Sequence, residues 1–260
     1  MWQAHRHEHA PADRFPTAVA AGPQPPGHRR RDQGPGPRQQ LADQGPGALS
    51  LRAIARQMGT ASSALYRYFA SYDELISALC VDAYTALADQ ASAARDTQPP
   101  DDPARQWWAI CNAFRRWALD NPADFALIFG SPVPDYQAPE PVTGPAAGRA
   151  TAIPLNIYAA AVAAGHADPD RTQVPQDFEV SEFLRNLLAD AAPDYPPRLA
   201  GIALGAYASV LGYLVAEVFG SLARLVADSD QLYRAHLRTV MLGMGFQPAL
   251  IEAADAPGHS

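Results

Sequence analysis

Hydrophobic residues recur every three or four positions along most of this chain, a spacing that places them on one face of a helix. Helices are therefore predicted between residues 50 and 94 and over 104–119, 122–129, 149–164, 180–191, 197–226 and 229–242. The five prolines of 131–148 predict a loop there. No segment shows the alternation of polar and apolar residues that is typical of a strand. The pattern predicts an all-α protein.

The clearest local pattern lies between residues 50 and 75. Ser50 is a typical N-cap residue, and the apolar stripe of the helix that follows consists of Leu51, Ile54, Ala55 and Met58. Gly59 has the backbone freedom to end this helix before a second short helix begins. Ser71 and Glu74 then form a capping box that opens a long third helix. Two short helices joined by a tight turn are the helix-turn-helix unit that places a helix in the major groove of DNA.

The charge of this segment supports an interaction with DNA. The whole chain has a net charge of -7, yet positions 50–70 hold three arginines and no acidic residue. Phosphate binding requires a positive field and hydroxyl donors, and the segment offers both. The predicted DNA-binding residues are Arg52, Thr60, Ser62, Ser63, Tyr66, Arg67, Tyr68 and Tyr72. An Ala-rich helical hairpin with a solvated face is the alternative, since this geometry also occurs in proteins that bind no DNA.

Residues 47–79 closely resemble the DNA-binding domain of TetR-type transcriptional regulators. The resemblance is carried by Leu51, Ile54, Ala55, Gly59, Leu65-Tyr66-Arg67-Tyr68-Phe69 and Asp73-Glu74-Leu75. It implies that residues 60–68 enter the major groove, with Tyr66 and Tyr68 on the DNA backbone. Tyr72 stands where the family often has Lys or Arg, so we expect the salt-dependent part of DNA binding to be weaker.

The segment before the motif departs from this family. TetR-type domains begin with a supporting helix, and here only residues 38–45 resemble its end. Pro35 and Pro37 cannot both lie in a helix interior. Residues 1–37 hold seven prolines and an Arg-rich run without helical period, so they are predicted to be a disordered extension. Two explanations stay open: a misread start or reading frame, which the lack of a replacement helix favours, and a basic arm that lies along the DNA.

The predicted domains are a helix-turn-helix domain over 38–80, a helical regulatory and dimerisation domain over 81–246, and a tail over 247–260. The regulatory domain resembles a WHG-like branch of TetR-type proteins. One part of that resemblance is Arg115-Arg116-Trp117-Ala118-Leu119 followed by Asn121-Pro122. The other part is Tyr207, Leu211, Gly212 and Glu217, where the branch often carries Trp, His, Gly and Glu.

Aromatic residues in the regulatory domain are candidates for an effector pocket. Rings between helices bind apolar or aromatic small molecules well, although rings at helical spacing also form ordinary cores. The predicted ligand-binding residues are Trp108, Trp117, Phe125, Phe129 and Tyr158. One face of the helix over 197–226 carries only small residues, which allow a second helix to approach closely. They are Gly201, Gly205, Ala208 and Gly212. This helix and the last one are therefore predicted to form the homodimer that a palindromic operator requires.

Other functional classes have little support. The chain has no Gly-rich phosphate loop, HExxH motif or nucleophile elbow, so we expect no catalysis, cofactor or metal site. Cys80 and Cys111 lack metal-ligand spacing; the sequence leaves a disulfide between them open, and the default prediction is two reduced, packed thiols. No unbroken apolar run reaches the ~20 residues of a membrane span, and residues 1–37 lack the apolar core of a secretion signal. We therefore expect a cytoplasmic protein without a membrane partner.

Two functional hypotheses remain. The first is a homodimeric, ligand-responsive transcriptional regulator, with repression as its expected mode, that binds double-stranded DNA and an unknown small-molecule effector. The second is a helical small-molecule-binding dimer that has lost DNA binding through its incomplete first helix. A salt-titrated DNA-binding assay separates them, because phosphate contacts make affinity depend on salt.

Overall fold

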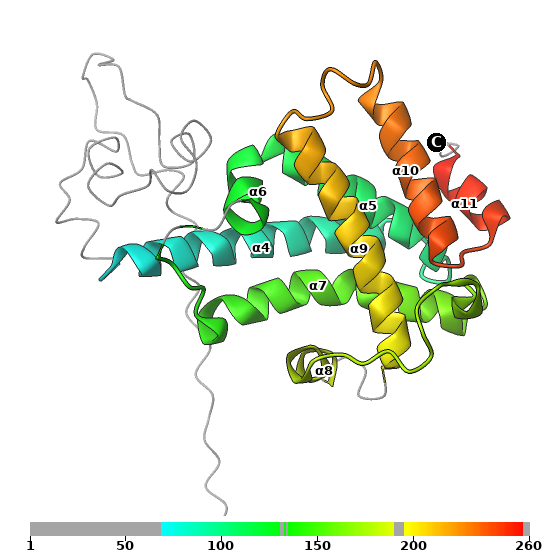
Figure 1. The fold of residues 1–260 in the computed structure, drawn as a ribbon, viewed down its shortest axis with the longest axis horizontal. Coiled ribbons are helices and arrows are strands. Elements are labelled where there is room, and N and C mark those ends of the chain that lie inside the picture. Colours follow the sequence, from blue (N-terminus) through cyan, green and yellow to red (C-terminus); the bar gives the residue numbers. More distant parts are fainter. Residues whose placement is uncertain (1–68, 131–132, 134, 190–194, 257–260) are drawn as a thin grey trace, which may run out of the picture. The chain divides into compact units, whose positions relative to one another are not determined.

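The computed structural model describes residues 69–130, 133, 135–189 and 195–256; helices joined by turns and loops make up this part of the chain, and it contains no strand. Figure 1 shows the arrangement of the helices. In chain order they are α4 (Tyr72–Asp96), α5 (Pro103–Asp120), α6 (Pro122–Phe129), α7 (Glu140–Ala163), the short 3-10 helix η2 (Pro169–Arg171), α8 (Glu182–Ala189), α9 (Pro197–Val218), α10 (Ser229–Gly243) and α11 (Pro248–Asp255). The all-α prediction is confirmed.

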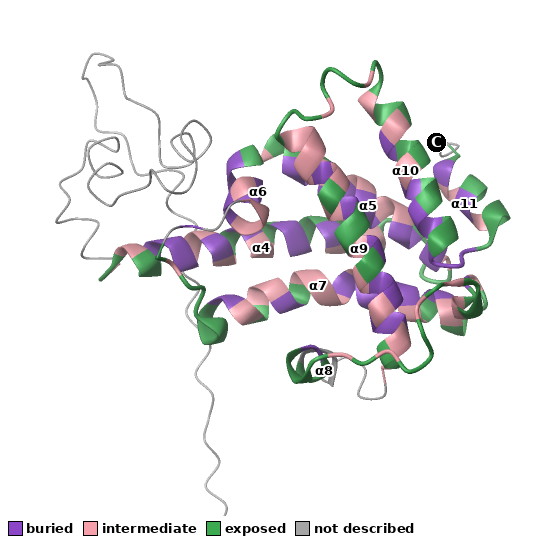
Figure 2. Ribbon diagram, in the orientation of Figure 1, coloured by how far each residue is buried: buried purple, intermediate pink, exposed green. Residues whose placement is uncertain are grey.

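One apolar core joins these helices. Helix α4 packs against α5 and α7, α9 packs against α5, α7 and α10, and α11 packs against α5 and α10. The largest side chains that are fully buried include Trp107, Trp117, Tyr158, Tyr233 and Phe246. Figure 2 shows that buried positions follow the inner faces of the helices. Each buried side chain of this size stabilises the fold by roughly 1.5–3 kcal/mol relative to exposure.

Local capping signals place several helix boundaries where the sequence predicted them. At the start of α4 the Ser71 hydroxyl accepts from the Glu74 backbone N–H at 3.1 Å, as predicted, while the Glu74 carboxylate accepts from the Ala70 backbone N–H at 2.6 Å instead of from that of Ser71. Helix α6 spans the predicted residues 122–129. Asp228 caps α10 by accepting from the Gln231 backbone N–H at 2.9 Å. Because α4 continues across positions 80 and 81, the two predicted domains share this helix.

Two helix boundaries differ from the prediction by more than two residues. Helix α7 begins at Glu140, within the segment predicted as a loop, and includes Pro145 and Pro154. Its N-terminal half buries Thr143 and Gly148, and α7 packs along α4, so packing offsets the hydrogen bonds that the prolines cannot make. Helix α9 ends at Val218 rather than at 226, and the chain then turns at Gly220, whose φ of 79° favours glycine.

The predicted C-terminal tail over 247–260 is wrong in its first part, where residues 248–255 form α11. Pro248 is the first residue of the helix, a position whose backbone N–H has no partner within a helix, so proline loses no hydrogen bond there. The side chain of Asp255 is only 4% exposed. It accepts from Arg234 Nε and from Arg238 Nε at 2.7 Å each. At eight residues the helix is too short for periodicity to reveal it.

Replacing Asp255 with Ala is expected to lower the free energy of unfolding by about 2 kcal/mol, because it removes charge-assisted hydrogen bonds to both arginines of α10. The comparison is Glu252→Ala, on the exposed side of the same helix, which should change stability by less than about 0.5 kcal/mol. Urea denaturation of both variants measures the difference. Equal stability of the two variants would show that the arginine contacts do not hold α11.

Among the described residues, α9 alone is long and apolar enough to cross a membrane when judged by length and composition. Its apolar inner face is accounted for within the fold. Leu199, Ile202, Val210 and Leu214 are buried, and α9 packs against three other helices. Helix α9 is therefore a helix of the core.

Candidate functional site

Seven of the eight predicted DNA-binding residues lie outside the described residues, so their contacts stay predictions: Arg52, Thr60, Ser62, Ser63, Tyr66, Arg67 and Tyr68. The eighth, Tyr72, is the first residue of α4 and is half-buried. Burial raises the pKa of its hydroxyl, and the charge of Asp73 acts in the same direction. Tyr72 therefore stays neutral near pH 7 and brings no charge to this position, where Lys or Arg would.

A separate apolar cluster holds the N-terminal half of α4, and we call it the junction cluster. Its buried members are Leu75, Ile76, Cys80, Ala123, Leu127 and Val133. The segment after α6 is also tied to α4 by polar contacts. The Ser77 hydroxyl donates to the Asp73 carbonyl at 2.7 Å, so the Tyr136 hydroxyl, 3.0 Å away, donates to Ser77 Oγ. The start of α4 therefore depends on α6 and on the chain that follows it.

Both cysteines are buried and free, as the sequence predicted. Burial raises the pKa of the Cys80 thiol to about 11 and outweighs the opposing effect of the neighbouring Tyr136 hydroxyl. Burial raises the pKa of the Cys111 thiol to about 12. Neither thiol is ionised near pH 7, so neither has the thiolate that redox or nucleophilic chemistry requires.

Six aromatic rings meet between α4, α5, α6 and the stretch from the middle of α9 to the residue after its end, and we call them the ring cluster. They are Tyr84, Phe114, Phe125, Phe129, Tyr207 and Phe219. The ring centroids of Phe125 and Phe129 are 5.3 Å apart, and the Phe114 and Tyr207 rings stack at 6.2 Å. Phe125 is fully buried, whereas Phe219 is 50% exposed. The cluster therefore extends from the core to the surface.

The ring cluster contains two hydroxyl groups but no charged side chain. Burial raises the pKa of both Tyr84 and Tyr207, so both phenols are neutral. Among the described residues neither hydroxyl has a hydrogen-bond partner. Each can therefore donate to a ligand. Such a site suits an uncharged ring compound with one or two polar atoms.

The five predicted ligand-binding residues do not form one site. Phe125 and Phe129 belong to the ring cluster. Tyr158 is buried elsewhere, where its hydroxyl donates to the Met244 carbonyl at 2.8 Å. Trp117 is a buried core residue, and Trp108 lines a separate surface hollow. The predicted set lacks Tyr84, Phe114, Tyr207 and Phe219, because spacing within one helix does not show which faces of distant helices meet.

Helix α6 connects the ring cluster to the junction cluster. Phe125 and Phe129 project into the ring cluster, while Ala123 and Leu127 belong to the junction cluster. Because the helix has only eight residues, a displacement of one face necessarily moves the other. The geometry therefore links a candidate ligand site to the end of α4 that follows the helix-turn-helix segment.

A buried ion-pair network fixes α5, α9 and α10 beside the ring cluster. Arg115 donates to both carboxylate oxygens of Glu217, at 2.8 and 2.6 Å. It also pairs with Asp230 at 2.7 Å, and its guanidinium lies 4.8 Å above the Tyr233 ring. Arg115 and Glu217 come from the two separate segments that resemble the WHG-like branch. Their bidentate pairing gives that resemblance a structural basis.

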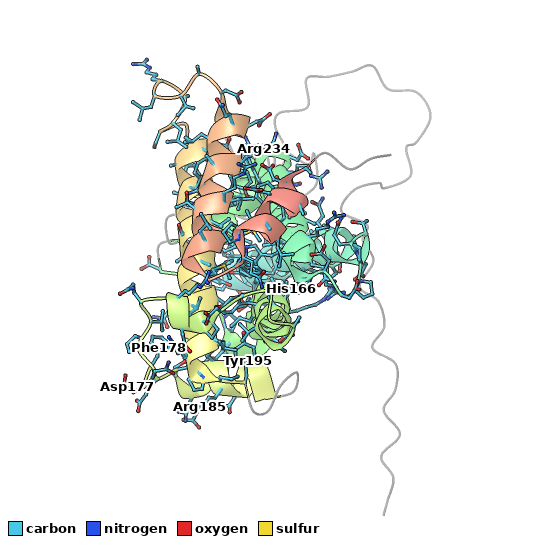
Figure 3. The ribbon with its side chains drawn as sticks, turned by 90° about the vertical axis from the view of Figure 1, so that its right-hand side faces the viewer. His166, Asp177, Phe178, Arg185, Tyr195 and Arg234 are labelled. Atoms are coloured by element: carbon cyan, nitrogen blue, oxygen red, sulfur yellow. The ribbon has the colours of Figure 1, made fainter. Side chains whose placement is uncertain are left out.

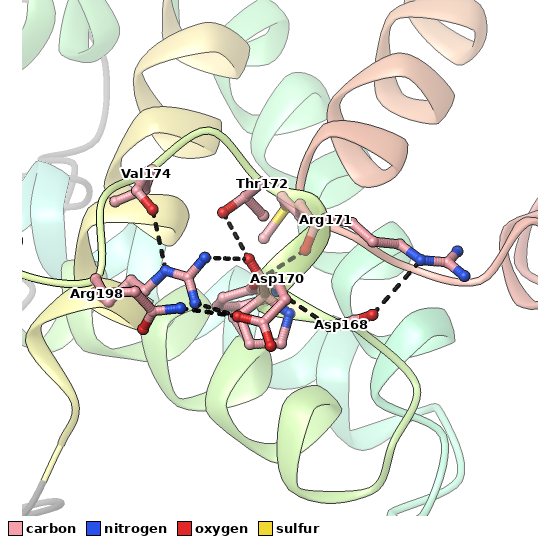
Figure 4. Close-up of polar contacts among 10 residues, drawn as sticks. Asp168, Asp170, Arg171, Thr172, Val174 and Arg198 are labelled. Atoms are coloured by element: carbon pink, nitrogen blue, oxygen red, sulfur yellow. Dashed lines mark hydrogen bonds and ion pairs between the residues drawn. The ribbon is translucent and has the colours of Figure 1, made fainter.

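Polar contacts also fix the other end of α9. Arg198 donates to the carbonyls of Val174 and Pro169, at 3.0 and 2.8 Å, and to Asp170 at 2.6 Å (Figure 4). These bonds hold the segment between α7 and α8 against α9. Figure 3 shows Phe178 at this end, away from Arg234. The N-terminal end of α9 is thus anchored, while its C-terminal end borders the partly open ring cluster.

Comparisons with known proteins agree with this architecture. The family described as "Bacterial regulatory proteins, tetR family" matches residues 38–79, and "Tetracyclin repressor-like, C-terminal domain" matches residues 107–240. HTH-type transcriptional regulator Rv1816 of Mycobacterium tuberculosis (strain ATCC 25618 / H37Rv) is 38% identical over 206 residues, which cover 78% of this chain and 87% of that protein.

Solved structures show the same fold. The crystal structure of regulatory protein SCO4313 is 33% identical with a TM-score of 0.57, covering 78% of this chain and 89% of that one. A protein from Rhodococcus sp. RHA1 reaches a TM-score of 0.59 at 22% identity, covering 80% and 91%. The matches define a transcriptional regulator with an N-terminal helix-turn-helix and a helical C-terminal domain. This chain belongs to the TetR family.

Proposed function

We propose that this protein is a homodimeric, cytoplasmic repressor whose affinity for a palindromic operator falls when an uncharged aromatic effector binds in the ring cluster. The observation that carries the proposal is the position of α6, which has Phe129 in the ring cluster and Leu127 in the junction cluster. A ligand that enters between the rings acts on α6 first. The change then reaches the N-terminal half of α4 through Ile76 and Cys80.

The operator is contacted by the predicted residues of 50–72, among which Tyr66 and Tyr68 bind the backbone. A backbone contact positions the protein without reading sequence. The match of residues 38–79 to the family's DNA-binding part supports this role over a dimer that has lost DNA binding. Effector binding shifts the population from a DNA-competent to an incompetent state, by no more than the difference in its affinity for the two.

The dimer forms through the outer faces of α9 and α10. Gly205 and Gly212 have nothing within 4 Å of where a Cβ would lie, so a second helix can approach α9 closely. Ala208 and Ser209 are exposed between these glycines. Gly201, also predicted to line the dimer contact, instead accommodates Phe178 of the same chain, whose ring lies 2.7 Å from the position of a Gly201 Cβ.

The effector site is tested with two uncharged probes, 1-naphthol and naphthalene, which differ by one hydroxyl. Replacing Tyr207 with Phe should weaken 1-naphthol binding about fivefold and leave naphthalene unchanged, since a neutral hydrogen bond contributes about 1 kcal/mol. Tyr213→Phe is the matched control, because its hydroxyl already donates to the Ser229 carbonyl outside the cluster. Calorimetry gives the affinities. Equal 1-naphthol affinity for the wild type and Tyr207→Phe would place the effector elsewhere.

A further inference from the structure

A hollow separate from the ring cluster lies between the C-terminal half of α4, α5 and α11. Its volume is about 660 Å³, within the range of roughly 300–1,000 Å³ that is usual for small-molecule sites. No residue of the ring cluster lines it. Two of its walls are formed by Ala93 and Ala94 of α4 and by Ala253 and Ala254 of α11. These small side chains leave space that a flat molecule can fill.

The outward side of α5 gives the hollow its polar and aromatic groups. Trp108, Asn112, Arg116 and Asp120 recur every fourth residue, so they follow one face of the helix. Trp108 is half-buried and offers part of its indole surface. An indole surface between alanine walls binds planar rings through dispersion and stacking.

Arg116 differs from the other arginines near the hollow. Arg115, its neighbour in the chain, is paired with Glu217 and Asp230. Arg105, at the other end of the hollow, is paired with Asp102. Among the described residues no carboxylate lies within ion-pair distance of the exposed Arg116. Its guanidinium is therefore available to bind a carboxylate or sulfonate group.

We propose that this hollow binds a planar aromatic monoanion, with its ring against Trp108 and the alanine walls and its anionic group on Arg116. Asp120 also lines the hollow and repels a second negative charge, so the site prefers monoanions to dianions. The proposal does not depend on the effector site in the ring cluster, on dimer formation or on operator binding.

The test uses 1-anilinonaphthalene-8-sulfonate and its uncharged analogue N-phenyl-1-naphthylamine on the full chain. Arg116→Gln should weaken binding of the sulfonate about fivefold, and Asp120→Asn should strengthen it about twofold, as expected for partly exposed charge pairs. Neither substitution should change the affinity for the uncharged analogue. Both positions are exposed, so folding should be unaffected. Arg224→Gln, an exposed arginine remote in sequence from the hollow, is the control.

A variant whose new side chain fills the hollow is the second test of the proposal. Ala93 is exposed at the wall of the hollow, so Ala93→Trp should abolish sulfonate binding while circular dichroism and thermal unfolding stay near wild type. The proposal is overturned if the sulfonate binds Arg116→Gln and Ala93→Trp with wild-type affinity, because the dye then lies elsewhere. Opposite effects of the two charge variants, together with loss in Ala93→Trp, would support it. The naphthol measurements on Tyr207→Phe concern the other site and are independent of this outcome.

Discussion

Replacing Arg115 with Ala is expected to lower the free energy of unfolding by about 3–5 kcal/mol, because it leaves the Glu217 carboxylate buried without a partner. The side chains of Arg115 and Glu217 are 13% and 8% exposed, so water screens this pair weakly. The same change also removes the guanidinium from the Tyr233 ring. Urea denaturation followed by circular dichroism measures the loss.

Two comparisons show whether the buried pair is responsible. Asp230 is 81% exposed, so Asp230→Ala should cost less than about 1 kcal/mol. The double variant Arg115→Met, Glu217→Leu should regain most of the stability, since well-packed apolar residues can replace a buried ion pair at little cost. If the single and double variants are equally unstable, the loss comes from packing of the arginine stem and not from the unpaired carboxylate.

Replacing Gly212 with Arg is expected to convert the protein to a monomer and to weaken operator binding by about a hundredfold or more. Within one subunit the new side chain meets open space, because nothing lies within 4 Å of a Cβ at this position. In the proposed dimer it would bury an unpaired guanidinium, which costs about 3 kcal/mol or more. Sedimentation velocity measures the state of assembly.

Ala86→Arg is the matched control for this effect. Ala86 is exposed on α4, away from the outer faces of α9 and α10, so the variant should remain dimeric. Thermal unfolding of the Gly212→Arg monomer should still be cooperative. A Gly212→Arg protein that is dimeric and binds its operator normally would show that the subunits meet through another surface.

The sequence predicted best those features that depend on nearby residues. The pairing of Ser71 with Glu74 is a chemical signal contained within a few positions, and the Ser71 hydroxyl caps α4 as predicted. The start of α7 could not be predicted in this way. Its prolines indicate a loop, and only packing along α4, which is distant in sequence, makes the helix favourable there.

The candidate site shows the same difference between features set by nearby residues and features set by tertiary packing. Phe125 and Phe129 were predicted from the aromatic content of one short helix, and they lie in the ring cluster. Tyr207 joins them only because α9 crosses α5, where its ring stacks on Phe114. Tyr158 is also a tyrosine with a similar sequence environment to that of Tyr207, but its hydroxyl donates a hydrogen bond to the Met244 carbonyl. Tertiary contacts, which a single sequence does not display, decide between a ligand-binding ring and a core ring.

Selection of binding sites from randomised duplex DNA by the full chain tests the central claim most directly. A dimeric TetR-family repressor should enrich a sequence with two-fold symmetry, whose half-sites lie about 34–36 Å apart. The logarithm of the affinity for that sequence should fall linearly with the logarithm of the salt concentration. In the wild type, 1-naphthol should lower this affinity. Failure to enrich any sequence at low salt, with a folded and dimeric protein, would contradict the account and favour a small-molecule-binding dimer that has lost DNA binding.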